Sequence, residues 1–531
     1  MTNLIAMIVL AATAAVFAFL IPFAIHRSYL LVLARRARDE IRDPWPEEDL
    51  PRVTVQLPMY NERQVAARVI DAAAQLDYPS ALLEIQVLDD SDDITVSLVA
   101  ERVAWWGARG VQIEQVRRDA RTGYKAGALS EGVARSRGEF LFVLDADFVP
   151  SPDTLRDLLM PMQDPDVGMV QAAWSHLNRF TNWLTESQGF LLDGHFLYEQ
   201  GGRYRGGRFF NFNGTAGLWR RTCMEDAGGW QSDTLTEDLD LSYRAQMAGW
   251  RFAYLDDVQV PAEIPDSVMA LELQQRRWAQ GGVQTGRKVL PALLRGPFPF
   301  AVKTEAVIHL FGHMAHPLTW LLALLLFPSA IARRALGLDH LLGLDVFLFG
   351  AATVPFILFY WMAGEERGVA RRGRFRSVLR TLAMGIGLSV PVTHAVLRGL
   401  RGTEDAFERT PKRGSSGMAS YAAAVPLPFG TIAKVSMAFL MTGYLLGAIA
   451  GGYWGQLPFI VLFLSGYMAL GLPVLQSHIS RRLASIRLPG IEKKKDEKRY
   501  PEGHASADGL HPIPGVSICS EAVVADECEA A

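Results

Sequence analysis

The pattern of apolar and polar positions changes twice along the chain. Residues 4–25 form an uncharged apolar run, and a helix that crosses a bilayer needs roughly 20 such residues. Short apolar runs then alternate with helix-like stretches, and long apolar segments return after residue 300. The pattern predicts four regions: an anchor with a basic flank (1–44), a soluble domain (45–300), a transmembrane and interfacial helical domain (301–480) and a disordered polar tail (481–531).

The soluble region has the pattern of an α/β domain. PRVTVQLPMYNE from Pro51, LLEIQVLDDSDD from Leu82 and GEFLFVLDADF from Gly138 are typical of strands, and VIDAAAQL and SLVAERVAWW between them are typical of helices. This alternation predicts a parallel sheet, in which ligands bind beyond the carboxyl ends of the strands. Those ends carry a group of polar residues: Asn61, Glu62, Asp89, Asp90, Asp145 and Asp147.

Basic residues near the apolar segments predict the membrane topology. Arg27, Arg35, Arg36 and Arg38 follow the first segment, and no Lys or Arg precedes it, so we expect an uncleaved anchor with the soluble domain in the cytosol. A further apolar stretch, 382–397, has basic residues on both sides and is expected to lie in the interface. The result is a multi-pass protein of the inner or plasma membrane, whose other spans are 306–331, 341–362, 435–450 and 457–475.

The net charge and the cysteine content argue against some classes of protein. The formal net charge is −3, which argues against a nucleic-acid partner. The three cysteines have neither the spacing of a zinc site nor that of a disulfide framework. Membrane lipid is an expected partner of the apolar segments, and a nucleic acid is not.

An acidic motif and a lysine could contact a phosphorylated ligand. Asp145-Ala146-Asp147 follows an apolar run, and two such carboxylates can share one hard divalent cation that bridges phosphate oxygens. A solvated strand end is the alternative for that motif alone. Lys125 lies among small residues and could reach a diphosphate, although Ala126 excludes a Walker A loop.

Two further motifs precede or lie on helices. Asp238 in Thr236-Glu237-Asp238 could accept a proton from an acceptor hydroxyl, while helix capping by Thr236 or Asp238 is the alternative. Gln274, Arg277 and Trp278 share one helix face, where Arg can bind a diphosphate and Trp can stack on a sugar. An interfacial amphipathic helix would also contain Arg and Trp.

In this order and spacing the motifs resemble the processive family-2 glycosyltransferases, whose signature is D, DxD, TED and QxxRW. QVLDDS, GYKAGAL, VLDADF, FNGTAG and TEDLDL are most similar to the cellulose-synthase-like mannan and glucan synthases. The resemblance is dense over residues 50–300 and loose in the membrane region. It implies a GT-A-type domain inserted between transmembrane helices.

The resemblance implies a role for each matching residue. Asp238 is the expected base, and Asp145 and Asp147 are expected to bind Mg²⁺ or Mn²⁺. Asn213 stands where related synthases have cysteine, so the acceptor could differ from cellulose. The expected nucleotide-sugar contacts are Tyr60, Asn61, Glu62, Asp89, Asp90, Lys125, Asp145, Gln274 and Arg277. The expected acceptor contacts are Phe210, Asn213, Gly214, Glu237 and Trp278, and a gating-loop-like segment, 403–413, contains Phe407, Thr410 and Lys412.

The expected activity is polymerisation of a β-linked glucan or mannan by an inverting hexosyltransferase, with export of the product. UDP-glucose is the favoured donor and GDP-mannose the second. A single-transfer glycolipid synthase, similar to ceramide glucosyltransferase, is the alternative enzyme. A membrane assembly component with a retired transferase domain is the alternative outside catalysis, and the intact motifs argue against it.

Overall fold

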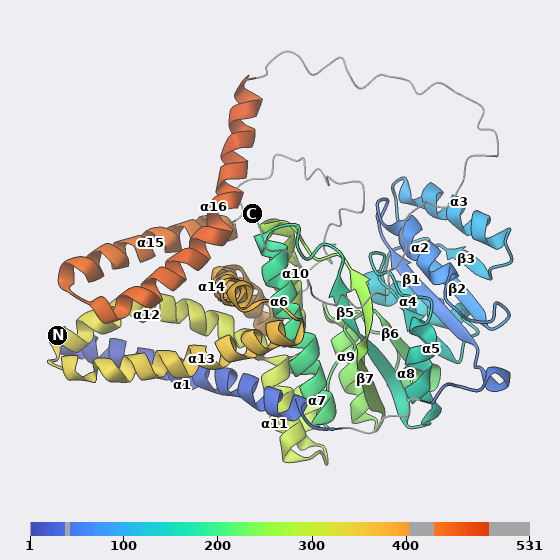
Figure 1. The fold of residues 1–531 in the computed structure, drawn as a ribbon, viewed down its shortest axis with the longest axis horizontal. Coiled ribbons are helices and arrows are strands. Elements are labelled where there is room, and N and C mark those ends of the chain that lie inside the picture. The colour runs from blue at the N-terminus through green and yellow to red at the C-terminus, as the bar shows by residue number, and fades with distance from the viewer. Residues whose placement is uncertain (1, 38–42, 403–428, 488–531) are drawn as a thin grey trace, which may run out of the picture. The chain divides into compact units, whose positions relative to one another are not determined.

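A computed structural model describes residues 2–37, 43–402 and 429–487 of the chain. The chain divides into a first compact unit that ends at His478 and a second that begins at Ile479. Except for residues 479–487 at the end of the last described helix, the features below belong to the first unit. It contains a mixed sheet covered by helices and a group of long apolar helices (Figure 1).

Seven strands form one sheet in the order β3-β2-β1-β4-β6-β5-β7. β1 pairs in parallel with β2 and β4, and β5 pairs in parallel with β7. Val53, Val55 and Leu57 of β1 are fully buried, because helices cover both faces of the sheet. The strands are β1 Val53–Met59, β2 Leu83–Asp89, β3 Ile113–Val116, β4 Phe140–Val143, β5 Val167–His176, β6 Gly217–Arg220 and β7 Arg251–Ala262.

The sheet departs from the parallel prediction at one strand. β6 runs antiparallel to both of its neighbours, β4 and β5. β6 has only four residues, too few for a periodic signal in the sequence. Because β6 is reversed, the loop before it lies at the same sheet edge as the carboxyl ends of β4 and β5.

Helices of the catalytic domain connect the strands and cover the sheet. α6 is continued without a break by a π-helical turn, η3 (His195–Gln200), and by α7. The α-helices are α2 Ala66–Ala74, α3 Thr95–Gly107, α4 Tyr124–Arg135, α5 Thr154–Leu159, α6 Trp183–Gly194, α7 Gly201–Arg205, α8 Arg221–Asp226, α9 Glu237–Met247 and α10 Val268–Arg295. The remaining short turns are the 3₁₀ segments η1 Glu47–Asp49 and η2 Met160–Gln163.

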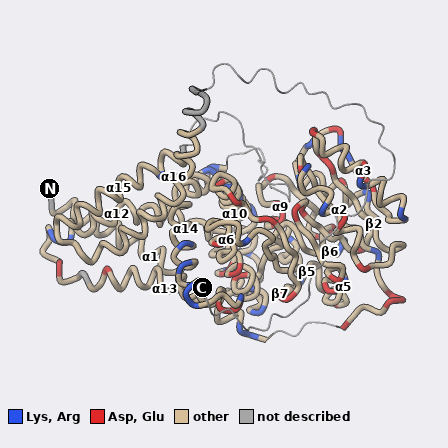
Figure 2. Tube along the Cα trace, turned by 45° about the horizontal axis from the view of Figure 1, so that its top comes forward, with Lys and Arg blue, Asp and Glu red and all other residues tan. Residues whose placement is uncertain are grey.

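Six helices within the described ranges are long and apolar enough to cross a membrane. Five of them contain few charged residues, whereas α14 has arginines towards both ends and charges are frequent in the sheet-containing domain (Figure 2). The apolar region contains α1 Thr2–Ala34, α11 Phe300–Leu310, α12 Ala315–Ala335, α13 Leu342–Glu366, α14 Arg371–Arg401, α15 Phe429–Gly451 and α16 Leu457–Arg487. The 3₁₀ turns η4 Gly312–Met314, η5 Asp339–Leu341 and η6 Trp454–Gln456 lie between them.

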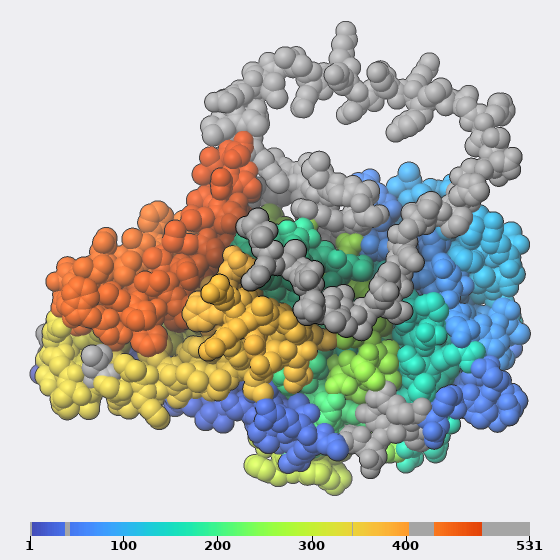
Figure 3. Space-filling model, viewed as in Figure 1, coloured from blue at the N-terminus to red at the C-terminus, as the bar shows by residue number. Residues whose placement is uncertain are grey.

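The stretch predicted to be interfacial lies in α14, which is one of the six helices. α14 packs against α10 and α6 of the catalytic domain and against α12 and α13. Figure 1 shows α14 almost end-on where α12 and α13 run across the view, and Figure 3 shows it between those helices and the catalytic domain. Its interfacial position stays a prediction that this packing favours.

The span predicted over residues 306–331 is instead divided in two. α11 ends at Leu310, and α12 begins at Ala315 after a 3₁₀ turn. Pro317 lacks an amide hydrogen, and its ring would clash with the carbonyl of His313 in a continuous α-helix. Glu305 is thereby placed on a separate helix that packs against α10.

Two charged residues in the apolar region form a pair. Arg333 of α12 forms an ion pair with Asp345 of α13, and Gln456 donates to the same carboxylate at 3.2 Å. A buried charge with a partner is far less costly than an isolated one. The pairing accounts for a charged residue in each of two otherwise apolar helices.

Candidate active site

A cavity opens at the carboxyl edge of the sheet, where the sequence motifs predicted a site. Most of the predicted residues line it. The predicted lining residues are Tyr60, Glu62, Asp90, Lys125, Asp145, Asp147, Asn213, Gly214, Glu237, Asp238, Gln274, Arg277 and Trp278. Three strands (β1, β5 and β7), four helices (α4, α6, α9 and α10) and the loops at this edge of the sheet line the cavity, which agrees with the binding rule for α/β sheets.

Lys125 joins the DxD motif to the loop before β6. Its ammonium donates to Asp145 Oδ1 at 2.6 Å and to the Gly214 carbonyl at 2.8 Å. Burial lowers the pKa of Lys125, but Asp145, Glu237 and Asp238 raise it more, and the net pKa is raised. A permanent positive charge therefore stands beside the carboxylates, where it can meet a diphosphate.

Asp238 lies in the first turn of α9 with Thr236 as the N-cap residue, yet Thr236 makes no side-chain capping bond. The Thr236 hydroxyl instead contacts Thr285 Oγ1 at 3.2 Å. Burial, and then the nearby Glu237, raise the pKa of Asp238 to about 7, against the opposing effects of Lys125, the Leu239 amide and Arg277. A carboxylate with a pKa near neutrality is suited to accept a proton.

The predicted helix face of Gln274, Arg277 and Trp278 lies on α10, and all three side chains line the cavity. Asp238 and Lys125 lie on other elements of the same wall. Thr236 also packs on α10, because a Cβ at Gly281 would lie 2.5 Å from Thr236 Cγ2. This close approach fixes α10 against the start of α9.

A further basic side chain lines the side of the cavity near β1 and β2. Arg121 lies over the Tyr60 ring, 3.4 Å from its centroid, and was not singled out from the sequence. Asp90 is paired with Arg118, whose Nε lies 2.9 Å from Asp90 Oδ1. Aromatic, acidic and basic groups thus line the side where a nucleotide was expected.

Three predicted ligand contacts lie outside the cavity lining. The Asp89 carboxylate is buried and accepts from Gln115 at 2.7 Å and from the Ser91 amide at 3.0 Å. Asn61 donates to Asp92 at 2.8 Å, and Phe210 is packed in the aromatic core. Their positions support the lining residues rather than face the cavity.

Backbone strain is concentrated at the same edge. Within the described ranges, the residues other than glycine with positive φ are Asn61 (56°), Tyr124 (50°) and Ala216 (53°). Each lies at or next to a loop of the cavity, and such conformations persist only where the surrounding structure enforces them. The strain indicates that these loops are held for a purpose other than stability.

Asp145 and Asp147 are the residues that could hold a divalent cation. No group of three or more His, Cys, Asp or Glu side chains suited to a metal occurs in the described part of the chain. Mg²⁺ in phosphate-binding sites commonly uses one or two carboxylates and takes the remaining oxygens from phosphates and water. The DxD pair therefore fits a metal that binds together with a diphosphate.

The orientation of Asn213 follows from its neighbours. The Phe212 carbonyl can only accept, so the Asn211 atom 2.9 Å away is Nδ2. The same Nδ2 lies 3.1 Å from Asn213, which must present Oδ1 to it. His195 Nε2 lies 3.1 Å from that Oδ1 and donates to it in the tautomer that carries the hydrogen on Nε2. The Asn213 amide nitrogen is left as a buried donor without a protein partner in the cavity wall.

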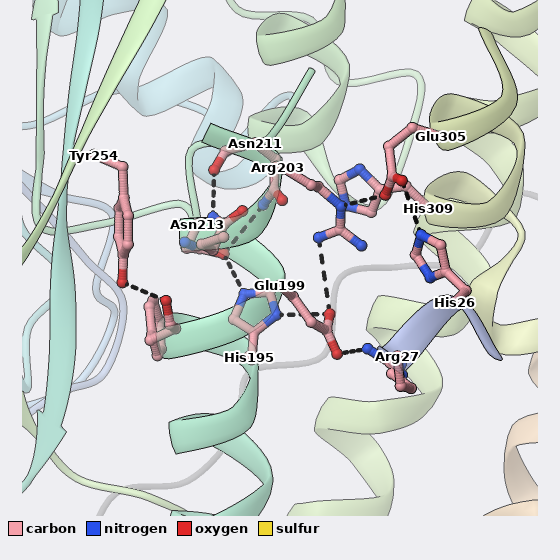
Figure 4. A network of polar contacts seen from close by, with 12 residues as sticks. His26, Arg27, His195, Glu199, Arg203, Asn211, Asn213, Tyr254, Glu305 and His309 are labelled. Atoms are coloured by element: carbon pink, nitrogen blue, oxygen red, sulfur yellow. Dashed lines mark hydrogen bonds and ion pairs between the residues drawn. The ribbon is translucent and has the colours of Figure 1, made fainter. Parts of the chain in front are cut away.

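A buried ionic network extends from Asn213 to the first apolar helix (Figure 4). His195 Nδ1 lies 3.2 Å from Glu199, which also pairs with Arg27 of α1. Arg203 donates to Glu305 Oε1 at 2.8 Å, and the other oxygen of Glu305 lies 2.8 Å from His26 Nε2. The network mechanically joins α1 and α11 to the loop that carries Asn213.

Removing one member of this network should destabilise the protein strongly. Glu305 has a side-chain exposure of 2 %, so Glu305→Ala leaves Arg203 buried without its closest counter-charge. We expect the free energy of unfolding to fall by about 3–5 kcal/mol, measured by thermal or denaturant unfolding in detergent. Glu47→Ala is the matched control: its carboxylate pairs with Arg156 but is 68 % exposed, and its loss should cost under about 1 kcal/mol. Equal losses would contradict the role of the network.

The gating-loop-like residues Phe407, Thr410 and Lys412 lie outside the described residues. Sequence reasoning missed several lining residues, of which four have charged or hydrogen-bonding side chains: Arg121, Trp174, His176 and Glu263. Trp174 and His176 occur at alternate positions at the end of an apolar run, which was the available signal. No motif marked Arg121 or Glu263.

Comparison with known proteins agrees with this site. Residues 51–281 match the family model described as "Glycosyltransferase like family 2". Glucomannan 4-beta-mannosyltransferase 2 of Arabidopsis thaliana is 38% identical over 356 residues, which are 64% of this chain and 65% of that protein. Probable glucomannan 4-beta-mannosyltransferase 11 of Arabidopsis thaliana is 38% identical over 335 residues, which are 60% of this chain and 76% of that protein. This chain belongs to the family 2 glycosyltransferases.

The similarity does not extend over the whole of each relative. This family 2 glycosyltransferase spans less than two thirds of several curated relatives, including the 65% of the first Arabidopsis protein and 62% of glucomannan 4-beta-mannosyltransferase 1 of Oryza sativa subsp. japonica. The matched family region, residues 51–281, includes the DxD and TED motifs and the Gln274-to-Trp278 segment. The catalytic domain therefore carries the family assignment.

A solved structure supports the fold. "Mannosyltransferase PcManGT from Pyrobaculum calidifontis in complex with GDP-Man and Mn2+" matches this family 2 glycosyltransferase with a TM-score of 0.50 and 22% identity, over 76% of this chain and 100% of that chain. The predicted GT-A fold is confirmed. The preference for UDP-glucose stated from the sequence has no support here, because the named relatives are glucomannan mannosyltransferases.

Proposed function

We propose that this chain is an inverting hexosyltransferase that extends a β-linked mannan or glucomannan with mannose from GDP-mannose. The observation that carries the proposal is the meeting of Asp145, Asp147, Lys125, Asp238 and Arg277 in one cavity. The cavity thus combines a pair of carboxylates that can bind a metal cation, two basic side chains and a carboxylate that can act as a base. The names of the curated relatives and of the structural neighbour support mannose as the sugar.

The residues divide between donor and acceptor. Lys125 and Arg277 bind the diphosphate and stabilise the charge that develops on it as it leaves. Asp238 takes the proton of the acceptor hydroxyl, whose oxygen attacks the anomeric carbon while the bond from that carbon to the diphosphate oxygen breaks. A divalent cation at Asp145 and Asp147, when bound, neutralises phosphate charge. Attack opposite the leaving group gives the β-linkage from an α-linked donor.

The proposal also includes action at a membrane. Six candidate spans and the contact of α14 with α10 support an enzyme that acts at a membrane. Passage of the product through these helices, and the role of residues 403–413 as a gate, belong to the same proposal.

A donor panel tests the function. Purified protein in detergent or nanodiscs is incubated with Mn²⁺ and GDP-mannose, GDP-glucose, UDP-glucose or UDP-N-acetylglucosamine, and nucleotide release and product length are measured. Release of GDP with a mannanase-sensitive polymer is expected, and chelation with EDTA should abolish it. UDP release with a glucan would overturn the sugar assignment, and a single sugar on a lipid would overturn polymerisation.

The rate should depend on pH through the base. Asp238 acts as a carboxylate, and its raised pKa of about 7 means that it is protonated below neutrality. We expect kcat/KM for the acceptor to rise with pH and level off above 7, with a fall of roughly tenfold per pH unit on the acid side. GDP binding measured over the same range should be flat. A profile already level at pH 5 would contradict the assignment of this carboxyl as base.

A further inference from the structure

Three residues of the cavity wall carry polar atoms that the protein leaves unused. Trp174 Nε1, both ring nitrogens of His176 and Asn213 Nδ2 are buried, and none has a hydrogen-bond partner. All three residues line the cavity. A buried polar atom without a partner costs about 1–3 kcal/mol, so several in one wall indicate a ligand that completes them.

Local structure places two of these side chains together. Trp174 and His176 are alternate residues at the end of β5 and project from the same face. In the register with β7, they lie opposite Val260 and Ala262, and Ala262 also lines the cavity. The Trp174 ring is held by Phe148 and Phe196, with both centroids 5.2 Å away.

The sheet order separates this group from the nucleotide side. β1 and β2, which are followed directly by Tyr60 and Asp90, lie on one side of β4, and β6 and β5 lie on the other. β5 is two strands from β4 and its Asp145, or about 10 Å at the usual strand spacing. Trp174 and His176 are therefore placed beyond the reaction centre, on the acceptor side.

The chemistry of the group indicates the class of ligand. Burial lowers the pKa of His176 to about 4, so its imidazole is neutral. The nearby Asp193 is already paired with Arg179 at 2.5 Å and with Arg367 at 3.2 Å. The wall thus offers indole, imidazole and amide N–H donors without a net charge, and hydroxyl oxygens of an uncharged sugar match them.

We propose that Trp174 and His176, together with Asn213, form a subsite for a sugar residue of the acceptor chain. The proposal rests on the proposed function for the identity of the sugar. It adds two residues that no sequence motif assigned, and it predicts that the enzyme prefers an oligosaccharide to a monosaccharide acceptor.

Binding without any donor tests the subsite separately from catalysis. The affinities of β-1,4-mannotetraose, cellotetraose and mannose are measured by calorimetry on the full chain with GDP and Mn²⁺. We expect one of the tetrasaccharides to bind more tightly than mannose. His176→Phe and Trp174→Phe should each weaken it roughly 3- to 10-fold, the value of one or two hydrogen bonds, and leave GDP affinity unchanged. His176→Gln, which keeps a donor, should stay within about twofold of the wild type.

Trp230→Phe is the matched control, because Trp230 Nε1 is also buried without a partner but does not line the cavity. It should leave tetrasaccharide affinity unchanged.

Unchanged affinity in both the His176→Phe and Trp174→Phe variants would overturn the subsite, as would a parallel loss of GDP affinity. If the wild type transfers no sugar but these variants still weaken tetrasaccharide binding, the proposed function fails and the subsite stands. If both variants transfer sugar normally and their acceptor KM is unchanged, the proposed function stands and the subsite fails.

Discussion

Asp238→Asn should reduce sugar transfer by about 10²- to 10⁴-fold while GDP-mannose still binds. The substitution keeps the size of the side chain and removes its ability to take a proton, and general base catalysis contributes a factor of this order. Lys125, Asp145 and Arg277, which face the diphosphate in our proposal, are unchanged. Single-turnover transfer and equilibrium binding of GDP-mannose measure the two effects separately.

Glu237→Gln is the companion variant, because Glu237 lines the same cavity and raises the pKa of Asp238. Its loss should lower the pKa of Asp238 and move the acid limb of the rate profile to lower pH. Near-normal transfer by Asp238→Asn would remove this residue from the role of base, whatever Glu237→Gln does.

Gly214→Ala should lower transfer by about two orders of magnitude in a protein that still folds. A Cβ at this position would lie 3.0 Å from Asp238 Oδ2 and 3.6 Å from Lys125 Nζ. Gly214 also has a φ of 83°, which a side chain makes unfavourable. Displacement of a reacting group by about 1 Å can cost about 10²-fold in rate.

Gly207→Ala separates the effect of the contact with Asp238 from the effect of the backbone conformation. Gly207 has a φ of 64°, but a Cβ there meets nothing within 4 Å. This control should lose about 1–2 kcal/mol of stability from the backbone alone and keep its transfer rate. If both variants lose activity to the same degree, contact with the base is not the reason, and our account of Gly214 is wrong.

The strands and motifs that could be predicted are those with a local signal. β1, β2 and β4 are apolar runs that end in polar residues, and the helix with Gln274, Arg277 and Trp278 has an unambiguous face. The meeting of Asp145 with Lys125 follows from the rule that strand ends share an edge. These features depend on neighbours in the sequence or on a general rule of sheets.

The features that could not be predicted depend on distant partners. His26 and Glu305 are 279 positions apart, and each appears in the sequence as an isolated polar residue near an apolar run. An ionisable residue inside an apolar helix is itself a signal of function, and this could have drawn attention to His26. The direction of the four-residue strand β6 and the π-helical turn at His195 had no sequence signal that we can identify.

The reversed strand β6 has a consequence for how the enzyme could be rebuilt. The chain leaves the sheet after His176 at the end of β5 and returns at Gly217, at the same edge. The Ala172 amide donates to the Ala216 carbonyl at 3.0 Å and closes the base of this excursion. Within it, α6 contacts α13 and α14, and η3 and α7 contact α1. The excursion is therefore an insertion between two strands of one sheet, and an exchange of residues 177–211 between relatives would have to keep the buried partners of Glu199 and Arg203 on α1 and α11.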